Sequence, residues 1–159
     1  MKRPIACLSF ALLAFQSAPA TGAEQWVIYK DATAAWGYNA GTLARDASGT
    51  INATYASYTV APAELKGRAY HYIVTDVTFD CGKRTARYIK MVSLDDDAGT
   101  VDVLSPGDKI PAKPIDDAVA FDTITQMLFG MACESKIAPK GGMPAGDRTS
   151  ALAKMKAPN

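Results

Sequence analysis

The longest strand-like region of the chain is Ala69–Leu94, and it constrains the fold more than any other feature. Its first arm has apolar side chains of one parity at Ile73, Val77, Phe79 and Cys81. Because successive side chains on a strand face opposite sides, this set can face a core. Gly82 and Lys83 can then form a two-residue turn of type II′, in which glycine suits the first position. The region therefore predicts a β-hairpin.

A two-residue loop also predicts the register of this hairpin. The expected opposite pairs are Cys81 with Arg84, Phe79 with Ala86, Val77 with Tyr88, and Ile73 with Val92. On the second arm, Ile89 and Met91 lie on the other parity. Either that face of the sheet is also partly covered, or a bulge shifts the register.

The N-terminus has the layout of a secretory signal peptide. A basic start is followed by the apolar run Ile5–Phe15 and by small residues that end at Ala20 and Ala23. This run is too short to cross a bilayer core of roughly 30 Å as a helix. We therefore interpret residues 1–23 as a signal peptide and expect no membrane insertion after its removal. A buried N-terminal helix is the alternative.

The cysteines fit an exported protein. Cys7 lies within the signal peptide, with too little apolar sequence before it for a lipid-attachment site. Removal of the peptide leaves Cys81 and Cys133, and two cysteines in an exported protein usually pair. Their disulfide would close a loop of about 52 residues, which the chain-entropy model values at about 4 kcal/mol. Two buried free thiols are the alternative.

Charge divides the mature chain into two parts. Residues 24–134 hold 10 Lys/Arg against 15 Asp/Glu, whereas residues 136–159 hold five basic residues and one acidic residue. An acidic body argues against nucleic acid as a partner. Pro, Gly, Lys and Ala dominate the last segment, so we expect a disordered basic tail with at most a short helical turn at Ala151–Lys156.

The remaining pattern predicts an α+β domain over residues 24–135. Further strand-like segments are Glu24–Lys30, Trp36–Asn39, Thr50–Val60 and Thr100–Leu104. A helix is expected over Ala118–Glu134, with an apolar stripe at Phe121, Ile124, Leu128 and Met131. Asp116, Asp117 or Asp122 could cap it, so its start stays open. We predict an antiparallel sheet of five to six strands, with this C-terminal helix packed on one face and tethered by the Cys81–Cys133 disulfide.

Several of these features resemble the surface-adhesin protein E family of bacterial exported proteins. The resemblance covers about Trp26–Glu134 and rests on Phe79-Asp80-Cys81, Arg84, Arg87, the Asp95–Gly99 turn and Ala132-Cys133. It implies an antiparallel sheet with a disulfide-tethered helix. The best-known member is a surface lipoprotein that binds host matrix and serum proteins. Without a lipid-attachment cysteine, this chain is expected in the periplasm or secreted, with cell-surface display less favoured. Only the two cysteines carry over as matched residues.

No catalytic or metal site stands out. His71 is the only histidine, no G-x-S-x-G motif occurs, and we assign no catalytic residue, cofactor or metal. Asp95–Asp97 with Gly99 and Asp102 offers oxygen atoms for Ca²⁺ but lacks the EF-hand spacing, so we interpret it as an acidic turn. On a regular strand Arg87 faces away from Arg84 and Lys90, which predicts that these cations do not form one patch.

Tyrosines indicate a contact surface. Tyr70 and Tyr72 lie on the parity opposite the predicted core, and tyrosine is favoured at recognition surfaces. We therefore expect an exported, non-enzymatic module of the adhesin type that binds a host matrix or envelope protein through Tyr70 and Tyr72. The alternative is a periplasmic structural or envelope-assembly component with no adhesive role.

Overall fold

The computed structural model describes residues 24–43 and 45–158, so the expected signal peptide lies outside the described residues. The described chain has strands β1 (Trp26–Lys30), β2 (Ala34–Asn39), β3 (Thr50–Leu65), β4 (Arg68–Asp80), β5 (Thr85–Leu94), β6 (Thr100–Leu104), β7 (Lys113–Pro114) and β8 (Met143–Gly146). Its helices are α1 (Thr123–Cys133), α2 (Arg148–Lys156) and two 3-10 turns, η1 (Ala40–Thr42) and η2 (Gly107–Lys109).

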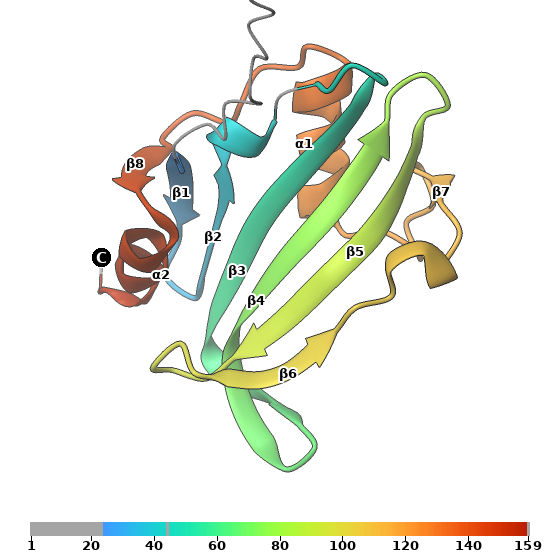
Figure 1. Cartoon of the computed structure of the whole chain (residues 1–159). Helices are drawn as coiled ribbons and strands as arrows, with labels where there is room; N and C mark the ends of the chain where they lie inside the picture. The colour runs from blue at the N-terminus through green and yellow to red at the C-terminus, as the bar shows by residue number, and fades with distance from the viewer. Residues whose placement is uncertain (1–23, 44, 159) are drawn as a thin grey trace, which may run out of the picture.

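All described strands belong to one antiparallel sheet. The order is β6-β5-β4-β3-β2-β1-β8, and β7 pairs with the start of β5 (Figure 1). The α+β class and the antiparallel sheet are therefore confirmed. The prediction of five to six strands and one helix is wrong, because the described residues form eight strands and two α-helices. The missed strands β7 and β8 are very short and contain proline, which hides them from a search for alternation.

The central hairpin β4–β5 has the predicted register next to its turn. Phe79 lies opposite Ala86, and Val77 lies opposite Tyr88. The turn itself is longer than predicted, since it takes the four residues 81–84. Its left-handed residue is Arg84, with φ 53°, and not Gly82. The Asp80 carboxylate accepts a hydrogen bond from the Lys83 amide at 2.9 Å, which stabilises this wider turn.

A bulge shifts the rest of the hairpin. Val77 pairs with Tyr88 and Asp76 with Lys90. Ile89 is thus an extra residue without a partner on β4. As a result Val92 lies opposite Val74, and the predicted pair of Ile73 with Val92 is wrong by one residue. The bulge anticipated as one alternative is present.

The two helices cover opposite faces of the sheet. Helix α1 packs near the β4–β5 turn, in a core with Ile51, Ala53, Val77, Phe79, Leu128 and Phe129. Helix α2 packs toward the other end of these strands, in a core with Trp26, Ile28, Ala56, Tyr72, Leu152 and Met155. Figure 1 shows α1 behind the sheet and α2 beside β1 and β2.

The long strands pass from one core to the other. Tyr55 and Ala56 are neighbours on β3 that face opposite sides, yet both are buried. On β4 the same holds for Val74 and Thr75. Each helix therefore covers half of one face. Helix α1 covers the half near the β4–β5 turn, and α2 covers the half at the other end of the strands on the opposite face. The other alternative raised for Ile89 and Met91, that both faces of the sheet are partly covered, therefore also holds.

The predicted disulfide joins Cys81 to Cys133, with Cα atoms 5.2 Å apart. It ties the β4–β5 turn to the end of α1. Beside it, Arg84 pairs with Glu134 and lies over the Phe129 ring, 5.5 Å from its centroid. The bond therefore holds α1 against the sheet as expected, although α1 is not the C-terminal helix.

Helix α1 has the later of the two possible starts. Asp122 is its N-cap, and its side chain accepts a hydrogen bond from the Thr125 amide at 2.7 Å. Asp117 instead caps a separate turn by accepting from the Val119 and Ala120 amides. The predicted helix residues before Thr123 are therefore not helical.

The expected disorder of residues 136–159 is wrong for the described part, which ends at 158. Strand β8 pairs with β1, and α2 begins at an Asp147 N-cap. Buried Ala151, Leu152 and Met155 give α2 an apolar side that composition alone conceals. At Gly37 a Cβ atom would lie 2.8 Å from the Met155 methyl group, so this glycine permits the close packing of α2 on β2.

No helix in the described ranges is a candidate for a membrane span. Neither α1 nor α2 is long and apolar enough to cross a membrane.

Candidate binding surface

The two predicted contact tyrosines have different environments. Tyr72 is 2% exposed, because α2 covers its face of the sheet, and its hydroxyl donates to the Leu152 carbonyl at 3.2 Å. Burial, assisted by Tyr58 and nearby carboxylates, raises the pKa of Tyr72 to about 12. Tyr72 is therefore a core residue, and its assignment to a contact surface is wrong. Tyr70 is half-buried and lies on a projecting hairpin.

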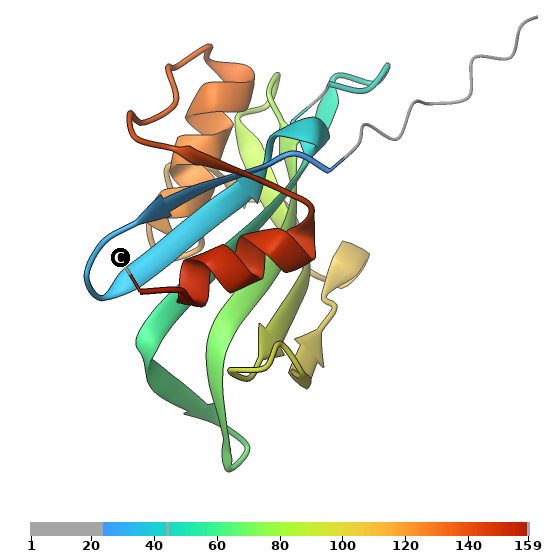
Figure 2. The same cartoon turned by 90° about the vertical axis from the view of Figure 1, so that its left-hand side faces the viewer.

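We call this hairpin, residues 59–70, the arm. After Tyr58 pairs with Tyr72, the register shifts and resumes where Ala63 lies opposite Tyr70. Lys66 and Gly67 form the tip, and both have positive φ, 54° and 74°, as in a type I′ turn. The arm extends beyond β6 and away from both helices (Figures 1 and 2).

Contacts at its base and tip connect the arm to the rest of the protein. Thr59 pairs with Ala34 of β2, and the Val60 amide donates to the Thr33 carbonyl at 3.2 Å. Lys66 forms an ion pair with Asp102 at 2.9 Å, and Arg68 donates to the Val101 carbonyl at 3.4 Å. At the base, Nδ1 of His71 lies 2.9 Å from the Thr59 carbonyl oxygen. A two-stranded hairpin alone is marginally stable in water, so these contacts position the arm while its surface stays exposed.

The strand-like segments expected from the sequence, Thr50–Val60 and Ala69–Leu94, leave residues 61–68 between them as a connection, so the arm was missed. The signal that could have found it is Lys66-Gly67, a pair that suits a tight hairpin turn between two segments of similar length. Pro62 and the irregular register beside it conceal the alternation.

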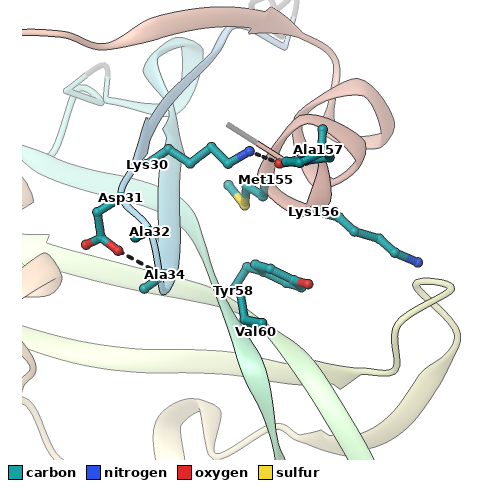
Figure 3. A pocket seen from close by; sticks show the side chains of 10 residues that line it. Lys30, Asp31, Ala32, Ala34, Tyr58, Val60, Met155, Lys156 and Ala157 are labelled. Carbon is teal, nitrogen blue, oxygen red and sulfur yellow. Dashed lines mark hydrogen bonds between the residues drawn. The ribbon is translucent and has the colours of Figure 1, made fainter.

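A small pocket of about 80 Å³ lies at the base of the arm, where α2 ends (Figure 3). Its lining comprises Lys30, Asp31, Ala32, Ala34, Tyr58, Val60, Met155, Lys156, Ala157 and Pro158. Val60 is an arm residue and is 59% exposed. Tyr58 and Met155 supply the apolar inner wall, so one small apolar group can enter beside Val60.

The charged groups around this pocket already have partners. The Lys30 amine donates to the Ala157 carbonyl, and Lys156 pairs with Asp96 at 2.6 Å. The bond to Asp96 is the main reason that the pKa of Lys156 is raised. Asp31 accepts from the Thr33 amide at 2.8 Å, which leads the causes that lower its pKa. These pairings leave the pocket suited to an apolar side chain rather than to a free ion.

The acidic turn after β5 has a structural role. Asp95 accepts hydrogen bonds from the amides of Asp97 and Gly99, while Lys156 pairs with Asp96. The turn therefore anchors the end of α2. In the described ranges, no group of His, Cys, Asp and Glu side chains could hold a metal ion.

The prediction that these cations do not form one patch holds for Arg84, which lies against Glu134 and Phe129 on the α1 side. It is wrong for Arg87 and Lys90, which share one face of the sheet. The bulge at Ile89 reverses the alternation, so Arg87 and Lys90 lie opposite Thr78 and Asp76, which share one face of β4. The change of parity at Ile89 and Met91 was a signal of this bulge, but a partly covered second face explained it equally well, so the charges were placed on a regular strand.

A buried polar cluster, also missed in the sequence, fixes the start of α1. The Tyr55 hydroxyl donates to Asp122 at 2.7 Å and lies 3.0 Å from the Thr125 hydroxyl, which is itself 3.2 Å from the Tyr88 hydroxyl. Burial, reinforced by the Asp122 charge, raises the pKa of Tyr55 far above its usual range. Each member has a partner, so the cluster stabilises the fold.

Comparisons with known proteins give no relative. A scan against protein-family models, a search of curated proteins and a search of solved structures each found no match. The binding surface must therefore be judged on its geometry.

Proposed function

We propose that this protein is an exported, non-enzymatic binding module that holds a protein ligand at the arm and the pocket at its base. The observation that carries the proposal is the arm itself. It is a β-hairpin that extends from the sheet with exposed side chains over most of its length. Projecting loops and hairpins on a rigid scaffold commonly carry recognition.

The pocket supplies an anchoring point next to the arm. Interfaces depend on a few side chains that enter well-packed pockets, surrounded by contacts of small individual value. Here the inner wall is Tyr58 and Met155, and Val60 forms the exposed rim. A partner that inserts one apolar side chain there would also contact the arm.

Export and the adhesin-type role rest on the sequence. The signal-peptide layout supports a periplasmic or secreted location, and the resemblance to the surface-adhesin protein E family supports a host matrix or envelope protein as the ligand. The disulfide is consistent with an oxidising compartment.

The alternative, an envelope-assembly component, would contact anionic partners through a free basic tail. Lys136 pairs with Glu134, Lys154 donates to the Pro144 carbonyl, and Lys156 pairs with Asp96. Three of the five basic residues of this segment thus have partners within the fold. We therefore favour the binding module.

Val60→Asp tests the proposed surface. The charge would lie at the pocket rim on an already exposed side chain, so folding should persist while capture of the protein ligand falls at least tenfold. Capture from periplasmic and host-matrix extracts by the immobilised protein measures this effect. Val119→Asp is the matched control, because Val119 is 98% exposed and does not line this pocket. Equal capture by both variants and the wild type would rule out the pocket.

A further inference from the structure

A second pocket, of about 170 Å³, lies beside β5 and β7 and against the turn that precedes α1. Figure 1 shows β7 next to the start of β5, at the side of the sheet away from α2. The residues that form its walls and rim include Ala86, Tyr88, Ile110, Pro111, Lys113 and Phe121. The arm extends from the other end of the sheet, so this site is separate from it. We call it the edge pocket.

The interior of the edge pocket is apolar. The rings of Tyr88 and Phe121 lie with their centroids 5.3 Å apart, and Ala86 between the strand neighbours is buried. The Tyr88 hydroxyl lies 3.2 Å from the Thr125 hydroxyl, so it already has a partner. Ile110 remains 46% exposed at the rim although its side chain is aliphatic. One bulky apolar side chain that entered the pocket would bury this surface.

A lysine lies at the rim of the same pocket. Lys113 is opposite Ala86 in the ladder of β7 and β5. Opposite residues of an antiparallel pair share a face, so both side chains point to the α1 side of the sheet. The Lys113 side chain is exposed, and its amine forms no hydrogen bond or ion pair with residues 24–43 or 45–158. This amine is therefore available to a ligand.

The acidic residues that follow Lys113 in the chain are already bonded elsewhere. Asp116 lies 3.5 Å from the Arg84 guanidinium, and Asp117 accepts hydrogen bonds from the amides of its own turn. Arg87, the other cation that lines the pocket, already has an interaction partner. The charge available to recognise an anion at this rim is thus that of Lys113, which suits a carboxylate beside an apolar group.

The strand edge beside the pocket also has main-chain groups without a strand partner. The Arg84 carbonyl accepts a hydrogen bond at 3.0 Å from the chain that follows β7, and Ala86 pairs with Lys113. Every second residue of β5 therefore directs its N–H and C=O toward β7, and the next one is Tyr88. Opposite it stands Pro111, which has no N–H, so the ladder ends. Among the described residues, no backbone hydrogen bond joins Tyr88 to this linker.

We propose that the edge pocket binds the C-terminal residue of an extended peptide, which carries a bulky apolar side chain and a free carboxylate. The side chain enters beside Phe121 and Ile110, and the carboxylate pairs with Lys113. The main chain of the peptide bonds to the N–H and C=O of Tyr88, as in other cases where a peptide adds to a sheet edge. A free organic acid with the same apolar group could make the first two contacts only.

Three capped peptides test the proposal by calorimetry. They are acetyl-Gly-Ala-Phe with a free C-terminus, the same peptide as its C-terminal amide, and acetyl-Gly-Ala-Gly with a free C-terminus. The first should bind at least tenfold more tightly than either of the others, because one lacks the carboxylate and the other lacks the apolar side chain. Phenylpropionate, which has both groups but no peptide bond, should bind at least threefold more weakly than the first peptide. Equal affinity for any of these comparators would overturn the proposal.

Lys113→Gln tests the charge at the rim. It should weaken binding of the free-acid peptide about tenfold and leave binding of the amide unchanged, because only the carboxylate contacts this amine. Lys140→Gln is the matched control, since Lys140 is also exposed and does not line the pocket. An equal loss in both variants, or no loss in Lys113→Gln, would contradict the assigned role of Lys113.

Ile110→Asp tests the apolar wall. A carboxylate at this half-exposed position should weaken binding of the free-acid peptide at least tenfold while the circular dichroism spectrum stays that of the wild type. In the wild type, amide NMR shifts caused by the peptide should map to residues 86–88, 110–113 and 120–121. Shifts confined to other parts of the protein would place the peptide elsewhere and overturn the proposal.

Discussion

The double variant Cys81→Ala, Cys133→Ala should lose about 4 kcal/mol of unfolding free energy. The bond closes a loop with a sequence separation of 52 residues, and the chain-entropy model assigns that amount to such a loop. For a domain with a total stability of about 5–15 kcal/mol, this loss is large. Urea unfolding at neutral pH, followed by circular dichroism without reductant, measures it.

Reduction of the wild type provides the internal control. Dithiothreitol should lower the wild-type unfolding free energy by a similar amount and leave the double variant unchanged. Without reductant, the urea-unfolded mature wild type should show no titratable thiol. A double variant within about 1 kcal/mol of the wild type would contradict the structural role of the bond.

Met155→Ala should cost about 3 kcal/mol, since truncation of a buried methionine typically costs 2–5 kcal/mol. Met155 is 1% exposed and packs in the core that α2 shares with β1 and β2. Its methyl group also reaches the space beside Gly37. The same urea titration measures the loss, and tryptophan fluorescence should report it because Trp26 lies in this core.

Thr149→Ala is the matched control on the same helix. Thr149 is exposed, so its change should alter the unfolding free energy by no more than about 0.5 kcal/mol. If Met155→Ala were equally mild, α2 would not be packed on the sheet, and the original expectation of a disordered tail would be restored.

The sequence could predict the parts of the fold that depend on local alternation or on the small number of cysteines. The β4–β5 hairpin, its register near the turn and the Cys81–Cys133 bond follow from residues close together or from the small number of cysteines. These features do not require knowledge of what covers each face. The turn type was mispredicted, because the Asp80 side chain accepts a hydrogen bond from the Lys83 amide and so stabilises the longer loop.

Apart from the helical turn expected at Ala151–Lys156, which lies within α2, the C-terminal segment was mispredicted because its order comes from tertiary contacts. Pro144 and Gly146 argue against a strand, but β8 needs only a free edge of β1 to pair with. In α2, Ala151, Leu152 and Met155 give a short apolar side that a composition rich in lysine obscures. Packing against a sheet can stabilise a helix whose own pattern is weak.

Two side chains were placed on the wrong side of the sheet, for different reasons. Tyr72 was placed on a free face because one sheet face was assumed to be uncovered throughout, and α2 covers it. Lys90 was separated from Arg87 because strict alternation ignores the bulge. In both cases the strand was predicted correctly, and the error lay in which side of it faces solvent.

The proposed function depends most on the arm as the contact element for a protein ligand. Replacing residues 59–71 with Asn-Gly would join Tyr58 to Tyr72, which already lie opposite each other, through a type I′ turn. The decisive measurement compares capture from periplasmic and host-matrix extracts by this variant and the wild type, with circular dichroism to confirm folding. Loss of the captured protein from a folded variant is the predicted result, and undiminished capture would contradict the proposed function.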